Sequence, residues 1–173
     1  MSTRVIVNGA FGKMGSIACA TLRKHQEFEL VATLGRQDNL RAVLKQTPAH
    51  IVIDLTCADC VYENSMAIIE AGIHPIIGTT GLKPEEITML QQHCKQQQLG
   101  GFIVPNFSLS AILMMHFASA AARLLPEVEI IEAHHPQKLD APSGTAIKTA
   151  KLIADAREAN HMTHISTDTN AAR

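Results

Sequence analysis

The sequence predicts an α/β fold built on a doubly wound parallel sheet, and three observations support this prediction. Short β-branched, apolar runs alternate with segments of helical periodicity along most of the chain. A glycine-rich turn follows the first apolar run and precedes a helical pattern. A second glycine-rich loop follows the fourth apolar run. Strands that alternate with helices are typically parallel and joined by right-handed crossovers.

Each predicted element has its own local reason. Strands are predicted where a short apolar run is bounded by turn residues, at residues 4–8, 28–34, 51–56, 74–77 and 102–104. Helices are predicted where apolar residues recur at helical spacing, at residues 17–22, 40–45, 61–71, 84–98, 109–125 and 144–156. Gly72 is expected to cap the third helix, and Pro84 to begin the fourth.

Composition excludes several classes of function. A chain of 173 residues with 46% hydrophobic residues can bury the core of one ordinary domain, with or without a fragment of a second. Fifteen basic and sixteen acidic residues leave a net charge of -1 without a basic block, so no nucleic acid partner is expected. No signal-peptide pattern and no membrane-length apolar run is present, so we expect a soluble, cytoplasmic protein without a membrane partner.

The four cysteines do not form an obvious metal site. Reduced thiols are the default in a chain without a secretion signal. Cys57 and Cys60 have the Cys-x-x-Cys spacing of redox or metal sites, but no second pair accompanies them. We therefore predict no bound metal.

The first glycine turn suggests a dinucleotide site. Gly9, Gly12 and Gly15 are spaced Gly-x-x-Gly-x-x-Gly between a predicted strand and a predicted helix. Phe11 stands where the usual motif has its second glycine. The same spacing also fits a tight strand–helix turn with no ligand.

The end of the second predicted strand bears on the choice of nucleotide. An acid at that position binds a ribose 2′-hydroxyl, whereas an arginine accommodates a 2′-phosphate. Here Gly35 and Arg36 follow the strand, without an acid at its end. The sequence therefore favours NADPH, with NADH also possible. The alternatives are that Asp38 reaches a ribose, or that Arg36 is a solvated loop residue.

Potential proton donors are concentrated in residues 132–146. His134, His135 and Lys138 precede Ser143, which occupies the expected N-cap of a helix. Free N–H groups at a helix start bind carboxylate or phosphate. This combination suits a small anionic substrate that must be protonated. The alternative is a surface turn in which Ser143 only caps the helix.

The same segment resembles a family signature. It reads Glu-Ala-His-His-Pro-Gln-Lys-Leu-Asp-Ala-Pro-Ser-Gly-Thr-Ala and is similar at every specified position to the motif of the dihydrodipicolinate reductase family. The Gly-x-Met-Gly at residues 12–15 and the Gly-Thr-Thr-Gly at residues 78–81 also resemble that family. The resemblance implies a Rossmann-like cofactor domain. It also implies reduction of 4-hydroxy-tetrahydrodipicolinate, a small dicarboxylate, with NAD(P)H in diaminopimelate and lysine biosynthesis.

The resemblance also implies roles for individual residues. His134 would be the catalytic acid and Lys138 a second positive group, while His135, Ser143, Gly144 and Thr145 would hold a substrate carboxylate. Cofactor contacts would come from the glycine turn, the end of the second strand, the second glycine loop and a hinge between domains. These are Gly9, Ala10, Phe11, Gly12, Lys13, Met14, Arg36, Gly78, Thr79, Thr80, Val104, Pro105, Asn106 and Phe107.

The resemblance also gives a domain organisation. We expect a dinucleotide-binding domain at residues 1–106 and an incomplete α+β substrate domain at residues 107–173, because the family continues with further strands. Full-length members of the family are expected to form tetramers, and the resemblance leaves the oligomeric state of this chain open. A non-catalytic NAD(P)-binding module is the main alternative. A metal-binding protein that uses His134, His135 and the cysteines is a weaker one.

Overall fold

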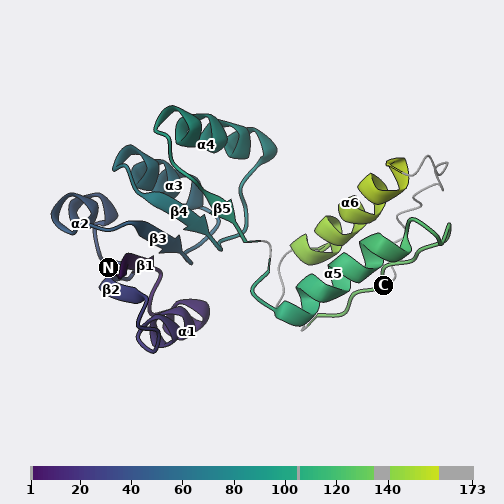
Figure 1. Ribbon diagram of the computed structural model, residues 1–173, viewed down its shortest axis with the longest axis horizontal. Helices are drawn as coiled ribbons and strands as arrows, with labels where there is room; N and C mark the ends of the chain where they lie inside the picture. Colours follow the sequence, from purple (N-terminus) through teal and green to yellow (C-terminus); the bar gives the residue numbers. More distant parts are fainter. Residues whose placement is uncertain (1, 105, 135–140, 160–173) are drawn as a thin grey trace. The chain divides into compact units, whose positions relative to one another are not determined.

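The chain forms two compact units. The computed structural model describes residues 2–104, 106–134 and 141–159. Unit 1 comprises Met1–Val104 and unit 2 comprises Pro105–Arg173 (Figure 1). None of the helices in these described ranges combines the length and the hydrophobicity needed to cross a bilayer.

Unit 1 is built on a five-stranded parallel sheet. Its strands are β1 (Thr3–Asn8), β2 (Phe28–Leu34), β3 (Ile51–Asp54), β4 (His74–Ile77) and β5 (Phe102–Ile103), in the order β2-β1-β3-β4-β5. The chain changes direction across the sheet between β1 and β3, which is where ligands bind in open parallel sheets. Asn8 is in register with both Leu34 and Asp54. The carboxyl ends of these strands therefore meet at one edge.

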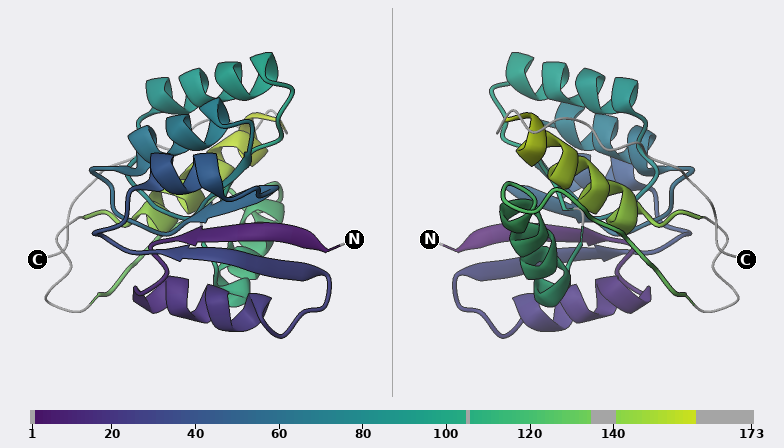
Figure 2. Two further views of the ribbon diagram at one scale, coloured as in Figure 1. Left: turned by 90° about the vertical axis from the view of Figure 1, so that its left-hand side faces the viewer. Right: turned by 90° about the vertical axis from the view of Figure 1, so that its right-hand side faces the viewer.

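Helices cover both faces of the sheet, as Figure 2 shows. On one face α1 (Lys13–Leu22) packs its Cys19 and Leu22 against Val5 and Val7. The opposite face carries α2 (Leu40–Gln46) and α3 (Val61–Glu70), and α4 (Pro84–Gln96) packs against α3. The predicted doubly wound parallel fold is confirmed.

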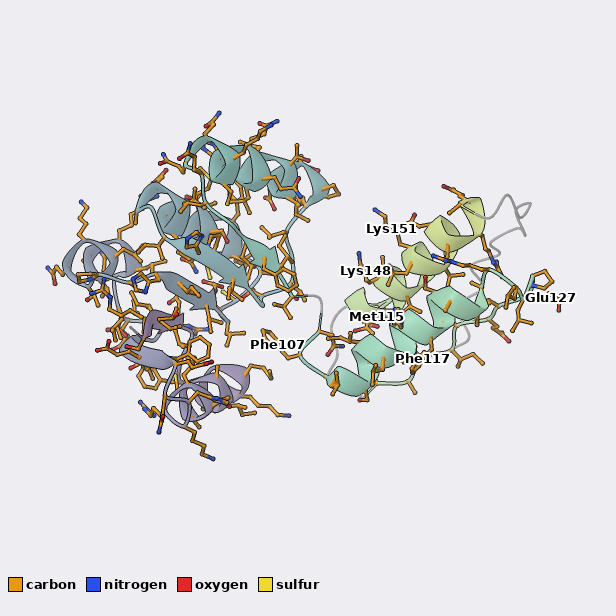
Figure 3. The ribbon with its side chains drawn as sticks, viewed as in Figure 1. Phe107, Met115, Phe117, Glu127, Lys148 and Lys151 are labelled. Atoms are coloured by element: carbon orange, nitrogen blue, oxygen red, sulfur yellow. The ribbon has the colours of Figure 1, made fainter. Side chains whose placement is uncertain are left out.

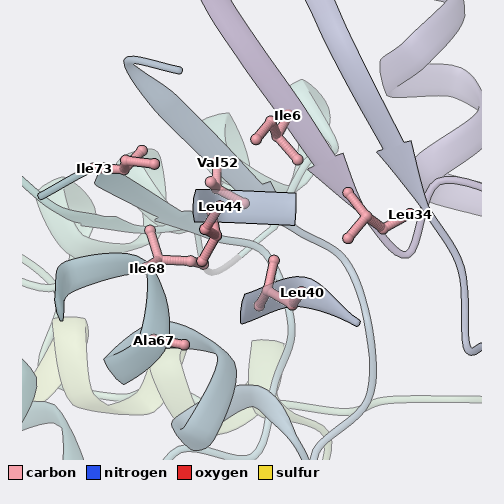
Figure 4. Packing of buried hydrophobic residues seen from close by; sticks show 8 residues of the cluster. All are labelled: Ile6, Leu34, Leu40, Leu44, Val52, Ala67, Ile68 and Ile73. Carbon is pink, nitrogen blue, oxygen red and sulfur yellow. The ribbon is translucent and has the colours of Figure 1, made fainter. Parts of the chain in front are cut away.

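The main core of unit 1 lies between the sheet and α2 with α3 (Figure 4). Ile6 and Val52 point into this core, while Val5 and Val7 point to the other face, so β1 is apolar on both sides. Strands that are buried on both faces are typical of parallel sheets. Eight buried residues form the cluster: Ile6, Leu34, Leu40, Leu44, Val52, Ala67, Ile68 and Ile73.

Most predicted boundaries agree with the structure to within two residues, but two helix boundaries differ by four, one of them being the end of the fifth predicted helix, which lies at Ala121 instead of at residue 125. The first helix begins at Lys13, four residues earlier than predicted, because Gly12 serves as its N-cap. The third strand ends at Asp54, where the side chain of that residue turns into a polar network. Gly72 follows α3 with a φ of +73°, so its predicted role as a C-terminal cap is confirmed.

Unit 2 consists, in its described residues, of two packed helices without a strand. They are α5 (Leu109–Ala121) and α6 (Gly144–Glu158). Met115 lies buried between them, whereas Phe117 points away from α6 and is 63% exposed (Figure 3). Arg157 on α6 donates hydrogen bonds to the carbonyl groups of Leu125 and Pro126. These bonds hold the segment just after α5 against α6.

Candidate active site

The turn after β1 is shaped by two glycines that cannot be replaced without movement of the backbone. Gly9 has a φ of +82°, and a Cβ there would lie 2.3 Å from the carbonyl oxygen of Leu55. A Cβ on Gly15 would lie 2.0 Å from the carbonyl oxygen of Gly9. Helix α1 therefore starts directly against the turn, as a dinucleotide-binding turn requires.

The start of α1 presents backbone N–H groups in an open setting. Gly12 is the N-cap and has no side chain to occupy the first N–H groups of the helix, which lack partners within a helix. Lys13 stands at the first helical position, and no acidic residue is present in the first turn. The side chains of Phe11 and Met14 are 76% and 40% exposed. This arrangement attracts an anion.

At the end of β2, Gly35 leaves space that an aromatic ring partly fills. A Cβ on Gly35 would lie 2.7 Å from Cδ2 of Phe11. The Gly35 N–H donates a 2.7 Å hydrogen bond to Oδ2 of Asp38, so this carboxyl group is engaged in closing the turn. Arg36 is exposed beside it. The strand end thus presents a guanidinium group and no free acid.

A buried carboxyl group organises the loops that follow β3 and β4. Asp54 is fully buried, and its Oδ2 accepts from the side-chain amides of Asn8 at 2.9 Å and Asn64 at 3.0 Å. Its Oδ1 accepts from the hydroxyl groups of Thr56 at 2.7 Å and Thr79 at 2.8 Å. The Thr56 N–H donates in turn to the Thr79 hydroxyl at 2.8 Å. Asp54 therefore ties four separate segments together at the carboxyl edge of the sheet.

The loop after β4 forms the wall of a small pocket at this edge. The pocket has a volume of about 220 Å³ and is lined by Met14, Leu55, Thr56, Cys57, Ala58, Gly78, Thr79 and Thr80. Four of these, Met14, Gly78, Thr79 and Thr80, are predicted cofactor contacts. The structure therefore brings part of the glycine turn and the second glycine loop to one place.

A larger cavity of about 480 Å³ lies elsewhere, between α4 and strands β4 and β5. Its lining is mostly apolar, including Ile87, Leu90 and Phe102, and contains none of the predicted site residues. Size alone would favour this cavity. The smaller pocket is the better candidate because glycine turns, a helix start and a buried polar network converge on it.

The predicted hinge residues divide between the two units. The Val104 N–H donates to the carbonyl group of Ile77 at 2.8 Å, which extends the β4–β5 pairing by one residue. Asn106 begins the described part of unit 2, where its side chain accepts from the Ser108 N–H and donates to the Thr145 hydroxyl. Phe107 is 47% exposed, and Pro105 lies outside the described residues.

In unit 2 a carboxylate connects the candidate acid to the start of α6. Oε1 of Glu132 accepts a 2.8 Å hydrogen bond from the Ser143 N–H, and its Oε2 lies 3.0 Å from Nε2 of His134. The side chain of His134 is 40% exposed and that of Glu132 is 27% exposed. His134 is therefore held by one ring nitrogen and remains accessible to a ligand. The other predicted groups of this segment, His135 and Lys138, lie outside the described residues.

The environment of Glu132 keeps it ionised. Hydrogen bonds from the hydroxyl group and the N–H of Ser143, and then from His134, lower the pKa of Glu132 from 4.5 to about 2. A carboxylate in this position is the natural partner for an N–H group of the imidazole ring. Glu132 thereby fixes the orientation of the His134 ring.

The start of α6 has the geometry that the sequence predicts. The Ser143 hydroxyl accepts from the Ala146 N–H at 3.2 Å, so its predicted role as N-cap is confirmed. A Cβ on Gly144 would meet no atom within 4 Å, which leaves open space beside the first helical N–H groups. The Thr145 hydroxyl is fixed by Asn106.

Two residues of the site have no predicted role in the sequence analysis. Glu132 begins the segment at residues 132–146 that resembles the family motif. It lies two residues before His134, and residues two apart in an extended segment point to the same side of the chain. Asp54 ends a buried apolar strand, where an acid without a partner would be costly. That position alone marks it as a residue with several hydrogen-bond donors around it.

Comparison with known proteins identifies the family. Residues 3–107 match the sequence profile described as dihydrodipicolinate reductase, N-terminus, and residues 110–171 match the profile described as dihydrodipicolinate reductase, C-terminus. The 4-hydroxy-tetrahydrodipicolinate reductase of Legionella pneumophila (strain Lens) is 61% identical over 158 residues. The protein of the same name from Coxiella burnetii (strain Dugway 5J108-111) is 48% identical over 157 residues.

Coverage and structure complete the comparison. The aligned residues are 91% of this chain but only 65% of the Legionella protein and 66% of the Coxiella protein. The dipicolinate-bound dihydrodipicolinate reductase from Paenisporosarcina sp. TG-14 superimposes with a TM-score of 0.80 at 36% identity. That match covers 100% of this chain and 72% of the solved one. The chain belongs to the dihydrodipicolinate reductase family.

Proposed function

We propose that this chain carries the cofactor-binding and proton-donating parts of an NAD(P)H-dependent 4-hydroxy-tetrahydrodipicolinate reductase of diaminopimelate and lysine biosynthesis. The observation that carries the proposal is the Glu132–His134–Ser143 arrangement at the start of α6, in a chain whose family is established. In this proposal residues 1–106 bind the dinucleotide, and residues 107–173 contribute to the substrate site.

The residues of unit 1 fit a nicotinamide dinucleotide. Gly9 and Gly15 let the turn pack closely against neighbouring backbone, and Gly12 leaves the first N–H groups of α1, beside Lys13, uncovered by a side chain for a pyrophosphate. The bound cofactor supplies the hydride. Thr79, held in the pocket wall by the Asp54 network, and its neighbour Thr80 would contact the nicotinamide end. Arg36 and the absence of a side chain at Gly35 favour NADPH, with NADH also accepted.

The residues of unit 2 fit a small dicarboxylate that gains a proton. Reduction of a conjugated C=C–C=N system places negative charge on the substrate, which an acid must quench. His134 would donate that proton, with Lys138 as a second positive group and Glu132 holding the imidazole ring. One substrate carboxylate would be bound by His135 and by the helix start at Ser143, Gly144 and Thr145. The dipicolinate bound to the Paenisporosarcina enzyme is a ligand of this chemical class.

Replacement of His134 tests this assignment. We expect His134→Gln to lower the rate of substrate-dependent NADPH oxidation by about 100-fold, the usual contribution of a positioned general acid, with NADPH affinity unchanged in isothermal titration. His116→Gln is the matched control, because His116 lies exposed on α5 of the same unit. Unchanged turnover in His134→Gln would remove His134 from the mechanism.

Titration also separates the reductase from a dinucleotide-binding module. A reductase binds both NADPH and pyridine-2,6-dicarboxylate, whereas a module without a substrate site binds NADPH alone. Heat released by the dicarboxylate with the parent protein, and lost when Ser143→Ala and Gly144→Val are introduced together, would support the reductase.

A further inference from the structure

Two thiols face each other beside the pocket at the carboxyl edge of the sheet. The carbonyl group of Cys57 accepts from the N–H groups of Cys60 at 3.2 Å and Val61 at 3.1 Å, so residues 57–60 form a tight turn that leads directly into α3. The turn places the sulfur atoms of Cys57 and Cys60 2.9 Å apart. A disulfide has an S–S length of about 2.05 Å, so bond formation requires an approach of less than about 1 Å.

The two thiols differ from the other cysteines in their setting. Cys57 is exposed and Cys60 is half-buried, whereas Cys19 is buried in the core beneath α1 and Cys94, although also half-buried, has no second thiol beside it among the described residues. Burial raises the pKa of both Cys19 and Cys94. The chain therefore contains internal controls that are less reactive, since the thiolate is the form that attacks a disulfide.

The surroundings of the pair favour one thiolate. Burial by itself raises the pKa of Cys60, but the hydrogen bonds that its sulfur makes with the Cys57 thiol and with the Thr56 hydroxyl outweigh burial and lower that pKa. The pKa of Cys57 is raised, first because its thiol donates to Cys60. Cys60 also stands at the N-cap of α3, where the helix dipole stabilises an anion.

The pair is also connected to the proposed dinucleotide pocket. Cys57 lines the pocket together with Thr56 and Thr79. The Cys60 thiol lies 3.4 Å from the Thr56 hydroxyl, which belongs to the network around Asp54. A disulfide has no S–H to donate, so oxidation removes this contact from the pocket wall.

We propose that Cys57 and Cys60 form a reversible dithiol–disulfide site, and that its oxidation is coupled to dinucleotide binding in the adjacent pocket. The oxidant is a small disulfide of the glutathione type. One cysteine thiolate attacks a sulfur of the oxidant, forming a mixed disulfide and releasing one thiolate. The second cysteine loses its proton to solvent and displaces the other thiolate. Two protein thiols are oxidised, and one disulfide is reduced to two thiols.

The first experiment needs no cofactor. The reduced 173-residue chain is incubated with oxidised glutathione, denatured, alkylated and digested. We expect the peptide that contains both cysteines to lose two hydrogens and to regain them with dithiothreitol, while Cys19 and Cys94 remain alkylated. Cys57→Ser and Cys60→Ser should each stop at a glutathione adduct. Full alkylation of both Cys57 and Cys60 in the treated parent protein would overturn the proposal.

The second experiment tests the coupling, which rests on the proposed function. Saturating NADPH should slow iodoacetamide alkylation of Cys57 by about tenfold, because a ligand in such a pocket covers most of its wall, and leave that of Cys94 unchanged. The disulfide form should bind NADPH about tenfold more weakly than the dithiol form in isothermal titration, which is a coupling of ordinary size for two linked sites. Absence of NADPH binding to the reduced protein would refute the proposed function and leave the disulfide result standing. NADPH binding without protection of Cys57 would refute the coupling.

Discussion

Alanine at position 15 should damage unit 1 more than alanine at position 12, although both glycines belong to the same turn. The Cβ at position 15 would lie 2.0 Å from the Gly9 carbonyl oxygen and 2.8 Å from Cα of Ala10. Contacts under 3.0 Å are essentially never seen, so the backbone must move by about 1 Å. Gly9 is held there by its hydrogen bond to the carbonyl group of Leu34. Neither side of the contact is a flexible side chain.

The expected size of the effect follows from two opposing terms. Overpacking of this kind costs about 1–3 kcal/mol, and values at the upper end apply because backbone must shift. Alanine inside a helix returns about 0.8–1 kcal/mol relative to glycine. Gly15→Ala should therefore lower the free energy of unfolding by about 1–2 kcal/mol, which corresponds to a Tm decrease of roughly 5–15 °C for a unit of this size.

Gly12→Ala is the matched comparison. Its Cβ would lie 3.4 Å from the Gly9 carbonyl oxygen, which is an acceptable contact, and its φ of -74° suits alanine. The loss of stability should stay below about 1 kcal/mol, the usual N-cap effect, while NADPH affinity falls because a methyl group covers the helix start.

Hydrogen exchange of the peptides from β1 and α1 measures these changes within unit 1 alone, and circular dichroism gives the Tm. The reasoning is refuted if Gly15→Ala melts at or above the parent temperature, or if Gly12→Ala is the less stable of the two.

Three further predictions concern other parts of the site. Asp54→Asn should lower the unfolding free energy by about 2–4 kcal/mol in urea titrations, because the new NH₂ group faces hydrogen-bond donors and cannot accept from them. Asp59→Asn, at an exposed position, is the control and should have no effect. Equal urea midpoints for Asp54→Asn and the parent protein would contradict the network. Glu132 has a lowered pKa, so its stabilising contribution is present above pH 4.5 and is lost as pH falls towards about 2. Glu132→Gln should therefore differ from the parent in its urea midpoint near neutral pH and converge with it in acid; a constant gap would show that ionisation is not the cause. Arg36→Ala should weaken NADPH binding about tenfold and leave NADH binding unchanged in isothermal titration, and an equal loss for both would place Arg36 away from the 2′-phosphate.

The order of elements was predictable from the sequence because it depends on local patterns. The apolar run before Gly9 and the helical spacing after it are sufficient to predict β1 and α1, and Ser143 predicts the start of α6. Helix starts were less predictable where no side chain caps them. Gly12 is an N-cap without a side-chain hydrogen bond, so α1 begins before its first clear apolar position.

The contacts between distant residues were not predictable in the same way. The Asp54 network requires β1, β3 and β4 to be neighbours, and the chain places Asn8 and Thr79 far apart in sequence. The short distance between the sulfur atoms of Cys57 and Cys60 depends on the geometry of the turn and does not follow from the Cys-x-x-Cys spacing alone. The roles of the predicted site residues in binding and catalysis remain predictions that the experiments above test.

The contact between Gly35 and the ring of Phe11 bears on which substitutions this protein can tolerate during evolution. A side chain introduced at this position would meet the ring of Phe11, which is 76% exposed and free to swing aside. A substitution at Gly9 would instead meet the main chain of Leu55. A residue with a Cβ at position 35 therefore requires only a side-chain movement, whereas one at position 9 requires a rearrangement of the main chain.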